Sequence, residues 1–345
     1  MRPHPRGRLA DQEAIPLETE DAVADEEAEA LDAADVVWDL SDLLDGRDDE
    51  DAVNDLLDRA EVLGTRLAAR RGELAGFGAE QLAAFMQEQG ELAELIGRAG
   101  SWASLRFAAD VNDPTRGALM QRVEERATAI QTGLVWFELE WSELDDARAD
   151  ALLGDERLAF AAHYLRTARS YRPHLLSEPE EILLTEKSVT GASAWSRLFS
   201  ELTSTIEVGL DGRVTTLEEG LSRLASGDAE VRRTAAQAVT EALQPGLRTR
   251  AFIYNTLIYD KAVDDRLRHF PTWISSRNLS NEATDESVEA LVSAVRARYD
   301  IPQRWYRLKA KLLGVERIKD YDRMASLATE DTRFGFDEAR ALVLD

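Results

Sequence analysis

The sequence predicts a mostly α-helical protein: a multi-helix lobe with one small β-hairpin near residues 203–216. Apolar residues recur at spacings of three and four through most of the chain, which is typical of helices that bury one face. Only the stretch TSTIEVGLDGRVTT favours strands, and its Asp211-Gly212 pair is suited to a tight hairpin turn. No fixed-period repeat interrupts this pattern.

Helices in the first half follow from the apolar periodicity. Order is expected to begin at VVWDLSDLL (36–44), which supplies the first concentrated apolar surface. One helical face of the next segment carries Val53, Leu56, Leu57, Ala60, Leu63 and Leu67. Residues 79–109 and 115–143 are predicted to be two long helices, separated by the turn signal Asn112-Asp113-Pro114. A further apolar face consists of Leu158, Ala161, Ala162, Leu165 and Ala168.

The second half has well-marked helix starts. Ser177 with Glu180, and Thr216 with Glu219, each fit a capping box, in which a hydroxyl residue is followed three positions later by glutamate. Helices are then predicted over residues 217–225, 229–243, 247–264, 285–299 and 302–313. The final stretch FGFDEARALVLD resembles a helix start without a glycine stop, so the chain is expected to end inside an element.

Composition limits the class of protein. Hydrophobic residues make up 44% of the 345 positions and charged residues 31%, as in soluble globular proteins. The absence of cysteine excludes disulfides and thiolate zinc sites. No apolar run is long enough to span a membrane, and the N-terminus lacks the apolar core of a secretory signal, so a cytoplasmic protein without membrane partners is predicted.

The net charge of −25 is concentrated at the N-terminus. The first 50 residues hold 17 acids and 4 bases, which leaves −12 for the other 295 residues. Residues 1–35 are interpreted as an acidic disordered leader, with an interaction tail as the alternative. A nucleic-acid partner is disfavoured because we find no basic face for phosphate binding.

The residues alone predict no catalytic and no metal-ligating site. Of the four histidines, His4 lies in the leader and His269 lies between Arg268 and Phe270. A zinc site formed by His163 and His174 with Glu180 or Glu181 is disfavoured, because an eleven-residue gap matches no known ligand spacing. Surface or helix-capping roles suit these histidines better, and Glu180-Glu181 is better explained as first-turn charge than as an acid–base pair.

Other chemical motifs are missing as well. The chain has no Gly-x-Ser-x-Gly elbow and no glycine-rich phosphate loop. Trp136 and Trp141 are expected in the core, not around a ligand. Substrate-binding residues therefore stay unassigned.

Several segments, in order, nevertheless resemble one family. They are VVWDLSDLL (36–44), SWASLRFAADVNDP (101–114), HYLRTARSYRPHLLSEPEEILL (163–184), TGASAWSRLFSEL (190–202), DAEVRRTAAQAVTEAL (228–243), NTLIYDKAVDDRLRHFPTWISSRNLSN (255–281) and WYRLKAKLLGVERIKDYDRMA (305–325), which contains three of the five lysines. Together they resemble the oligoendopeptidase F branch of the thimet-oligopeptidase-like zinc metallopeptidases. The resemblance implies that residues 36–205 form the helical N-terminal lobe of an oligopeptidase and that residues 206–345 begin its peptidase domain.

The family's zinc motif does not occur in this sequence. The resemblance implies that His-Glu-x-x-His should follow residue 325, with zinc as cofactor and short unstructured peptides as substrates, yet no histidine here precedes a glutamate. The chain is thus expected to bind no catalytic zinc and to be inactive alone, with the missing catalytic half packing against residues 206–345. The alternative is a non-enzymatic helical binding or scaffold module derived from a peptidase.

Overall fold

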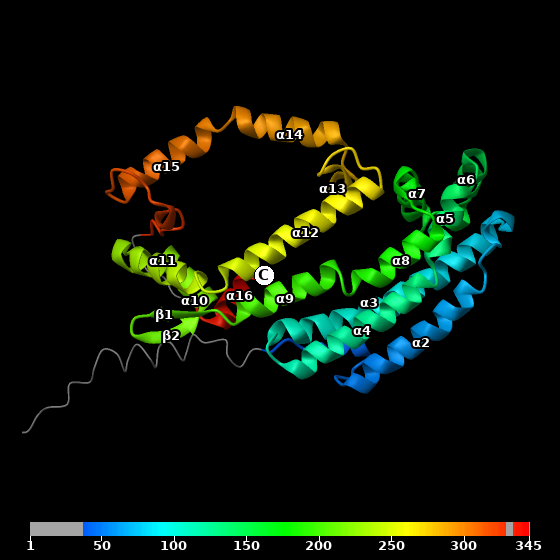
Figure 1. The fold of residues 1–345 in the computed structure, drawn as a ribbon, viewed down its shortest axis with the longest axis horizontal. Helices are drawn as coiled ribbons and strands as arrows, with labels where there is room; N and C mark the ends of the chain where they lie inside the picture. Colours follow the sequence, from blue (N-terminus) through cyan, green and yellow to red (C-terminus); the bar gives the residue numbers. More distant parts are fainter. Residues whose placement is uncertain (1–36, 329–333, 345) are drawn as a thin grey trace, which may run out of the picture. The chain divides into compact units, whose positions relative to one another are not determined.

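The computed structural model describes residues 37–328 and 334–344; the acidic leader and His4 lie outside this part of the chain. The described residues form helices and a single two-stranded antiparallel sheet, which confirms the predicted fold class (Figure 1). Leu40–Leu327 form one compact unit. The other unit contains helix α16 (Phe336–Leu344), at the predicted final helix start. Every helix in the described ranges is too short or too polar to cross a membrane.

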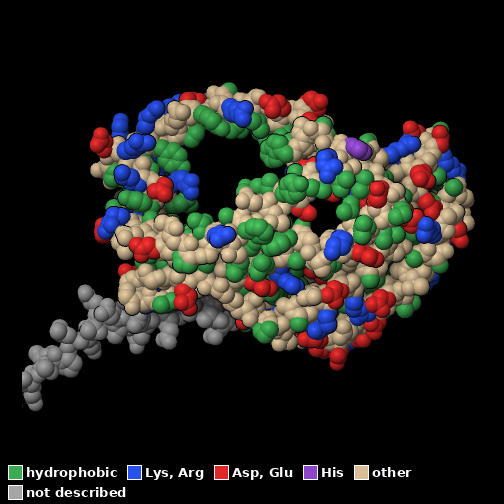
Figure 2. All heavy atoms as spheres, viewed as in Figure 1, with side chains coloured by type: hydrophobic (Ala, Val, Ile, Leu, Met, Phe, Trp, Pro, Cys, Tyr) green, Lys and Arg blue, Asp and Glu red, His purple; other side chains and the backbone are tan. Residues whose placement is uncertain are grey.

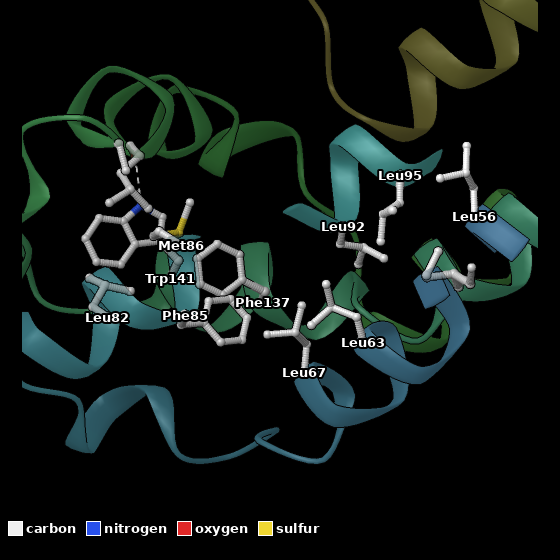
Figure 3. Close-up of a cluster of buried hydrophobic side chains, with 14 of the residues drawn as sticks. Leu56, Leu63, Leu67, Leu82, Phe85, Met86, Leu92, Leu95, Phe137 and Trp141 are labelled. Carbon is white, nitrogen blue, oxygen red and sulfur yellow. Dashed lines mark hydrogen bonds between the residues drawn. The ribbon is translucent and has the colours of Figure 1, made fainter. Parts of the chain in front are cut away.

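The larger core is built by α2 (Glu50–Ala68), α3 (Ala79–Ala109), α4 (Pro114–Thr132) and α5 (Val135–Glu143). All six residues of the predicted α2 face are buried, and α3 has the predicted bounds. Figure 3 shows leucines of α2 and α3 beside the aromatic rings of α3 and α5. The Phe85 ring stacks on Phe137, with centroids 4.7 Å apart. Trp136 and Trp141 are buried as expected, and the Trp141 indole donates to the Leu165 carbonyl at 2.8 Å.

One long helix predicted to be continuous is broken. Within residues 115–143, helix α4 is capped by Gly133, whose N–H donates to the carbonyls of Ala129 and Gln131. Helix α5 then begins at Val135. A Cβ at position 133 would lie 3.3 Å from the Ile130 carbonyl oxygen, so glycine suits this tight turn. The break redirects the chain before the α5 aromatic residues that enter the core. The predicted apolar face from Leu158 to Ala168 packs inward, and its residues are distributed over the 3₁₀ turn η3 (Glu156–Leu158), the short connection and α7 (Ala162–Ser170).

Two smaller expectations were partly wrong. In the segment 36–44, the turn η1 (Ser41–Leu44) packs Leu44 into the core, while Val37 and Trp38 are exposed. The Glu180 carboxylate accepts from the Ser177 N–H at 3.0 Å, as the capping box predicts. Thr216 also caps its helix, but the Glu219 carboxylate accepts from the Thr215 hydroxyl and from Arg213 instead of completing a capping box.

The β-hairpin belongs to a second, smaller core. Strands β1 (Glu207–Leu210) and β2 (Arg213–Thr216) pair antiparallel, with both turn residues, Asp211 and Gly212, at positive φ. Helices α10 (Leu217–Ser222) and α11 (Ala229–Leu243) cover the hairpin, joined by the turn η5 (Arg223–Ala225). The buried residues of this core are Val208, Leu210, Ala235 and Val239. The predicted domain boundary near residue 205 remains a prediction.

The remaining elements connect and follow these cores. They are the turns η2 (Leu74–Gly76) and η4 (Arg172–His174), helices α6 (Asp146–Leu153), α8 (Glu178–Ser188), α9 (Ala192–Ser204), α12 (Leu247–Leu267), α13 (Ser275–Ser280), α14 (Asp285–Ala297) and α15 (Asp300–Leu312), and the turn η6 (Asp320–Asp322). Helix α13 was not predicted, and α12 runs three residues past its predicted end at 264. Helix α12 packs along α9.

A buried ion pair ties the segment after α15 to the second core. The Arg232 side chain is 1% exposed and donates two hydrogen bonds to Asp322 Oδ1, at 3.2 and 2.8 Å. The same guanidinium donates to the carbonyls of Ser226 and Gly227. Lys309 is buried too, and its ammonium donates to the Arg323 carbonyl at 2.9 Å. The segment that contains three of the five lysines is therefore held in one position against α11.

Candidate functional site

The histidines considered for a metal site have other partners. His163 is largely exposed, and its Nε2 lies 2.9 Å from the Glu282 carboxylate, to which it donates. The His174 Nδ1 lies 2.8 Å from the Arg268 carbonyl oxygen, so this nitrogen carries the proton. The His174 ring also stacks on Phe270 at 3.8 Å. Within the described ranges, no group of three or more His, Asp or Glu side chains could hold a metal ion.

Glu181 has a structural role at the same place. Its carboxylate accepts two hydrogen bonds from Arg268, at 2.7 and 2.9 Å, and one from the Leu176 N–H. Burial alone would raise the pKa of Glu181, but the bonds from Arg268 and Leu176 outweigh it and lower the pKa. Arg268 also pairs with Asp264 one helical turn earlier. The cluster thus links the end of α12 to the start of α8.

A second feature has no such internal role: large apolar side chains on α12, α14 and α15 are exposed. Figure 2 shows an opening bounded by α11, α12, α14 and α15, with hydrophobic side chains along much of its edge. We call the exposed large apolar side chains of α12, α14 and α15 the apolar helix surface. Its members are Leu247, Tyr254, Ile258, Tyr259, Leu267, Leu291, Val295, Ile301, Trp305, Leu308 and Leu312, whereas the exposed Phe252 is excluded because it packs edge-on against Trp195 of α9.

The apolar side chains of α15 form one continuous stripe. Ile301, Trp305, Leu308 and Leu312 follow at spacings of four, three and four, so they share a helix face. The buried residues of this helix are Lys309 and Ala310, which leaves the stripe to solvent. Helix α14 has an apolar pair one turn apart, Leu291 and Val295, and no buried residue. Contiguous exposed apolar patches mark sites that bind a protein, a membrane or a ligand.

Sequence reasoning predicted these helices over residues 285–299 and 302–313. Through the family resemblance it also expected residues 206–345 to receive a missing half, but it named no residue of the surface. The spacing of the stripe was visible in the sequence. Its exposure was not, because exposure depends on what packs against the helix.

Comparisons with known proteins identify relatives of one kind. A family model described as Oligopeptidase F matches residues 140–207. The group B oligopeptidase PepB of Streptococcus agalactiae serotype III (strain NEM316) is 26% identical over 245 residues, which cover 68% of this chain and 41% of that protein. The oligopeptidase PepF of Bacillus subtilis (strain 168) is 23% identical over 321 residues, which cover 90% of this chain and 47% of that protein. The chain therefore spans about half the length of these curated relatives.

Solved structures share the fold. Oligoendopeptidase-F from Enterococcus faecium superposes with a TM-score of 0.72 at 19% identity, covering 82% of this chain and 57% of that one. A putative peptidase from Chlamydophila abortus gives a TM-score of 0.58 at 18% identity, covering 89% of this chain and 52% of that one. Together with the sequence matches, these structures confirm the resemblance to oligoendopeptidase F that the seven sequence segments, taken in chain order, had indicated.

Proposed function

We propose that this chain, which is related to the oligoendopeptidase F family, is the N-terminal portion of a cytoplasmic zinc oligopeptidase that hydrolyses short unstructured peptides. The observation that carries the proposal is the apolar helix surface. It lies within residues 206–345, where the catalytic half was expected to pack. The matched relatives are about twice as long as this chain, which supports a second half of similar size.

In this proposal the apolar helix surface receives the catalytic half. Burying the α15 stripe removes apolar area from water, at about 25 cal/mol per Å². The side of α15 that carries Lys309 and Ala310 is already packed, and Lys309 is bonded to Arg323, so the stripe can be covered without rearranging this helix. The arrangement suits a preformed face that binds its partner as a rigid body.

The described residues do not fit a zinc site of the family type. Such a site needs two imidazoles one helical turn apart on a single helix, and His163 and His174 lie on different elements. Zinc, when bound, would activate a water molecule for attack on a peptide carbonyl. Its ligands and the general base are assigned to the other half, and the 345-residue chain alone is proposed to be inactive.

A complementation experiment tests the proposal. The coding sequence is read beyond the codon for Asp345, and the downstream polypeptide, carrying His-Glu-x-x-His, is co-expressed with this chain. We expect chelator-sensitive cleavage of a quenched fluorescent peptide by the pair and none by either part. The variant Trp305→Glu/Leu308→Glu should abolish complementation. The control Val62→Glu, which introduces the same residue at an exposed apolar position on α2, should not.

Three outcomes would overturn the proposal. The first is stoichiometric zinc and peptide cleavage by the 345-residue chain alone. The second is normal complementation by Trp305→Glu/Leu308→Glu. The third is the absence of the zinc motif downstream, which would favour the non-enzymatic binding or scaffold module. That alternative draws support from the continuous buried core of α2 to α7, and it predicts a monodisperse chain that unfolds cooperatively without a partner.

A further inference from the structure

A cavity of about 740 Å³ lies between α15 and the segment that follows it. Its volume is within the usual range for a small-molecule or peptide site. Five cationic side chains line it, whereas only two acids do, Glu316 and Asp320. The cationic residues, called the basic cavity residues below, are Arg307, Lys311, Arg317, Lys319 and Arg323.

None of the basic cavity residues forms a side-chain hydrogen bond or an ion pair with any residue that the structure describes. Most other arginines in the described part of the chain form an ion pair with a carboxylate. Arg126, for example, contacts both Asp58 and Glu61 at 2.6 Å. All five residues are exposed, so water screens their mutual repulsion, and a bound anion would reduce it further. Figure 2 shows Lys and Arg side chains gathered over α15 and the segment after it.

The wall of the cavity is a fixed structure. Helix α15 ends at Leu312, Gly314 then turns the chain back with a φ of 67°, and the Val315 N–H donates to the Ala310 carbonyl. The Lys309 ammonium holds the Arg323 carbonyl, and the Lys319 N–H donates to Asp322 Oδ2 at 3.0 Å. Asp322 is itself held by the buried Arg232. The backbone that carries these cationic residues is therefore held in place by hydrogen bonds.

The lining also selects the kind of anion. Tyr306, Val315 and Ile318 contribute apolar surface between the cations. A free phosphate ion is much smaller than the cavity and would leave that apolar surface uncovered. A nucleic acid would need an extended basic face, and the net charge of −25 would repel it. Peptide carboxylates accept paired hydrogen bonds from guanidinium groups, and a neighbouring apolar side chain would fit the apolar lining.

We propose that this cavity binds a short acidic peptide, with its carboxylates on the basic cavity residues and an apolar side chain against Tyr306, Val315 and Ile318. Binding does not require the proposed catalytic half. Its success or failure is therefore independent of the proposed function.

Fluorescence anisotropy of the full 345-residue chain tests the proposal. The probe is a fluorescein-labelled octapeptide of alternating glutamate and leucine, and the matched probe has glutamine in place of every glutamate. We expect saturable binding of the glutamate probe only, weakened by added salt. Lys311→Gln/Arg317→Gln should weaken it by about tenfold or more, since two charge-assisted contacts are lost.

The control variant is Arg59→Gln/Arg166→Gln, which changes the net charge equally at two exposed arginines on α2 and α7. It should bind the glutamate probe as the parent does. Circular dichroism checks that both variants fold. Equal binding of the two probes, equal weakening by both variants, or no binding would overturn the proposal. Displacement of the probe by inorganic phosphate as effectively as by unlabelled peptide would instead assign the cavity to a simple anion and overturn the peptide ligand.

Discussion

Removing Asp322 should selectively destabilise the second core. In Asp322→Ala the Arg232 guanidinium stays buried but loses both hydrogen bonds to Oδ1, and the Lys319 N–H loses its acceptor. Breaking a buried ion pair by deleting one partner costs about 3–5 kcal/mol, because an uncompensated charge remains inside. Most of that cost should fall on α11, which contains Arg232, and on the hairpin, which packs against α11.

Hydrogen exchange followed by mass spectrometry measures this cost locally. Amides of α11 and β1 should exchange about a hundredfold faster or more, while amides of α3 in the other core stay protected. The control Glu50→Ala removes an exposed pair with Arg122 and should cost less than about 1 kcal/mol. Arg232→Met/Asp322→Leu should restore most of the protection. Exchange in α11 within about threefold of the parent in Asp322→Ala, or equal loss in α3, would refute this reasoning.

Three further outcomes are expected. Phe85→Ala should lower the free energy of unfolding by about 3–5 kcal/mol in chemical denaturation, because it empties a buried ring position between α3 and α5. Gly64→Ala should cost about 1–3 kcal/mol, since the added Cβ would lie 2.7 Å from Ile130 Cγ2; an unchanged melting temperature would contradict the close packing of α2 on α4. Hydrogen bonds from the Arg157 side chain and N–H lower the pKa of Asp155 from 3.8 to about 2, so its stabilising contribution is present above pH 3.8 and is lost as the pH falls through 2. Arg157→Gln should move the Asp155 titration midpoint towards 3.8 by NMR, and an unmoved midpoint would refute the role of the guanidinium.

Local signals in the sequence predicted most of the helices. The bounds of residues 79–109 and 229–243 follow from an apolar face flanked by turn residues, and the structure has the same bounds. The break at Gly133 was missed because a single glycine inside a periodic stretch is often tolerated. Helix α13 was missed because six residues give too short a period to recognise.

The candidate surfaces depend on contacts that are distant in sequence. That Ile301 and Trp305 share a face follows from spacing, but their exposure depends on the absence of a covering element in the described part of the chain. The concentration of lysines in residues 305–325 was plain in the sequence. Nothing local indicated that Lys309 would be buried while Lys311 and Lys319 line a cavity, because only the position of this segment against α11 separates them.

The Arg232–Asp322 pair has a consequence for protein synthesis, because the two partners are 90 residues apart. At about 5–20 residues per second, a ribosome takes about 4–18 s to proceed from one to the other. The first helical core is complete in sequence by residue 168 and can assemble during translation. Until Asp322 has been synthesised, Arg232 of α11 has no ion-pair partner and stays hydrated. Nascent chains arrested between these two codons should therefore carry a folded first core and a protease-sensitive hairpin.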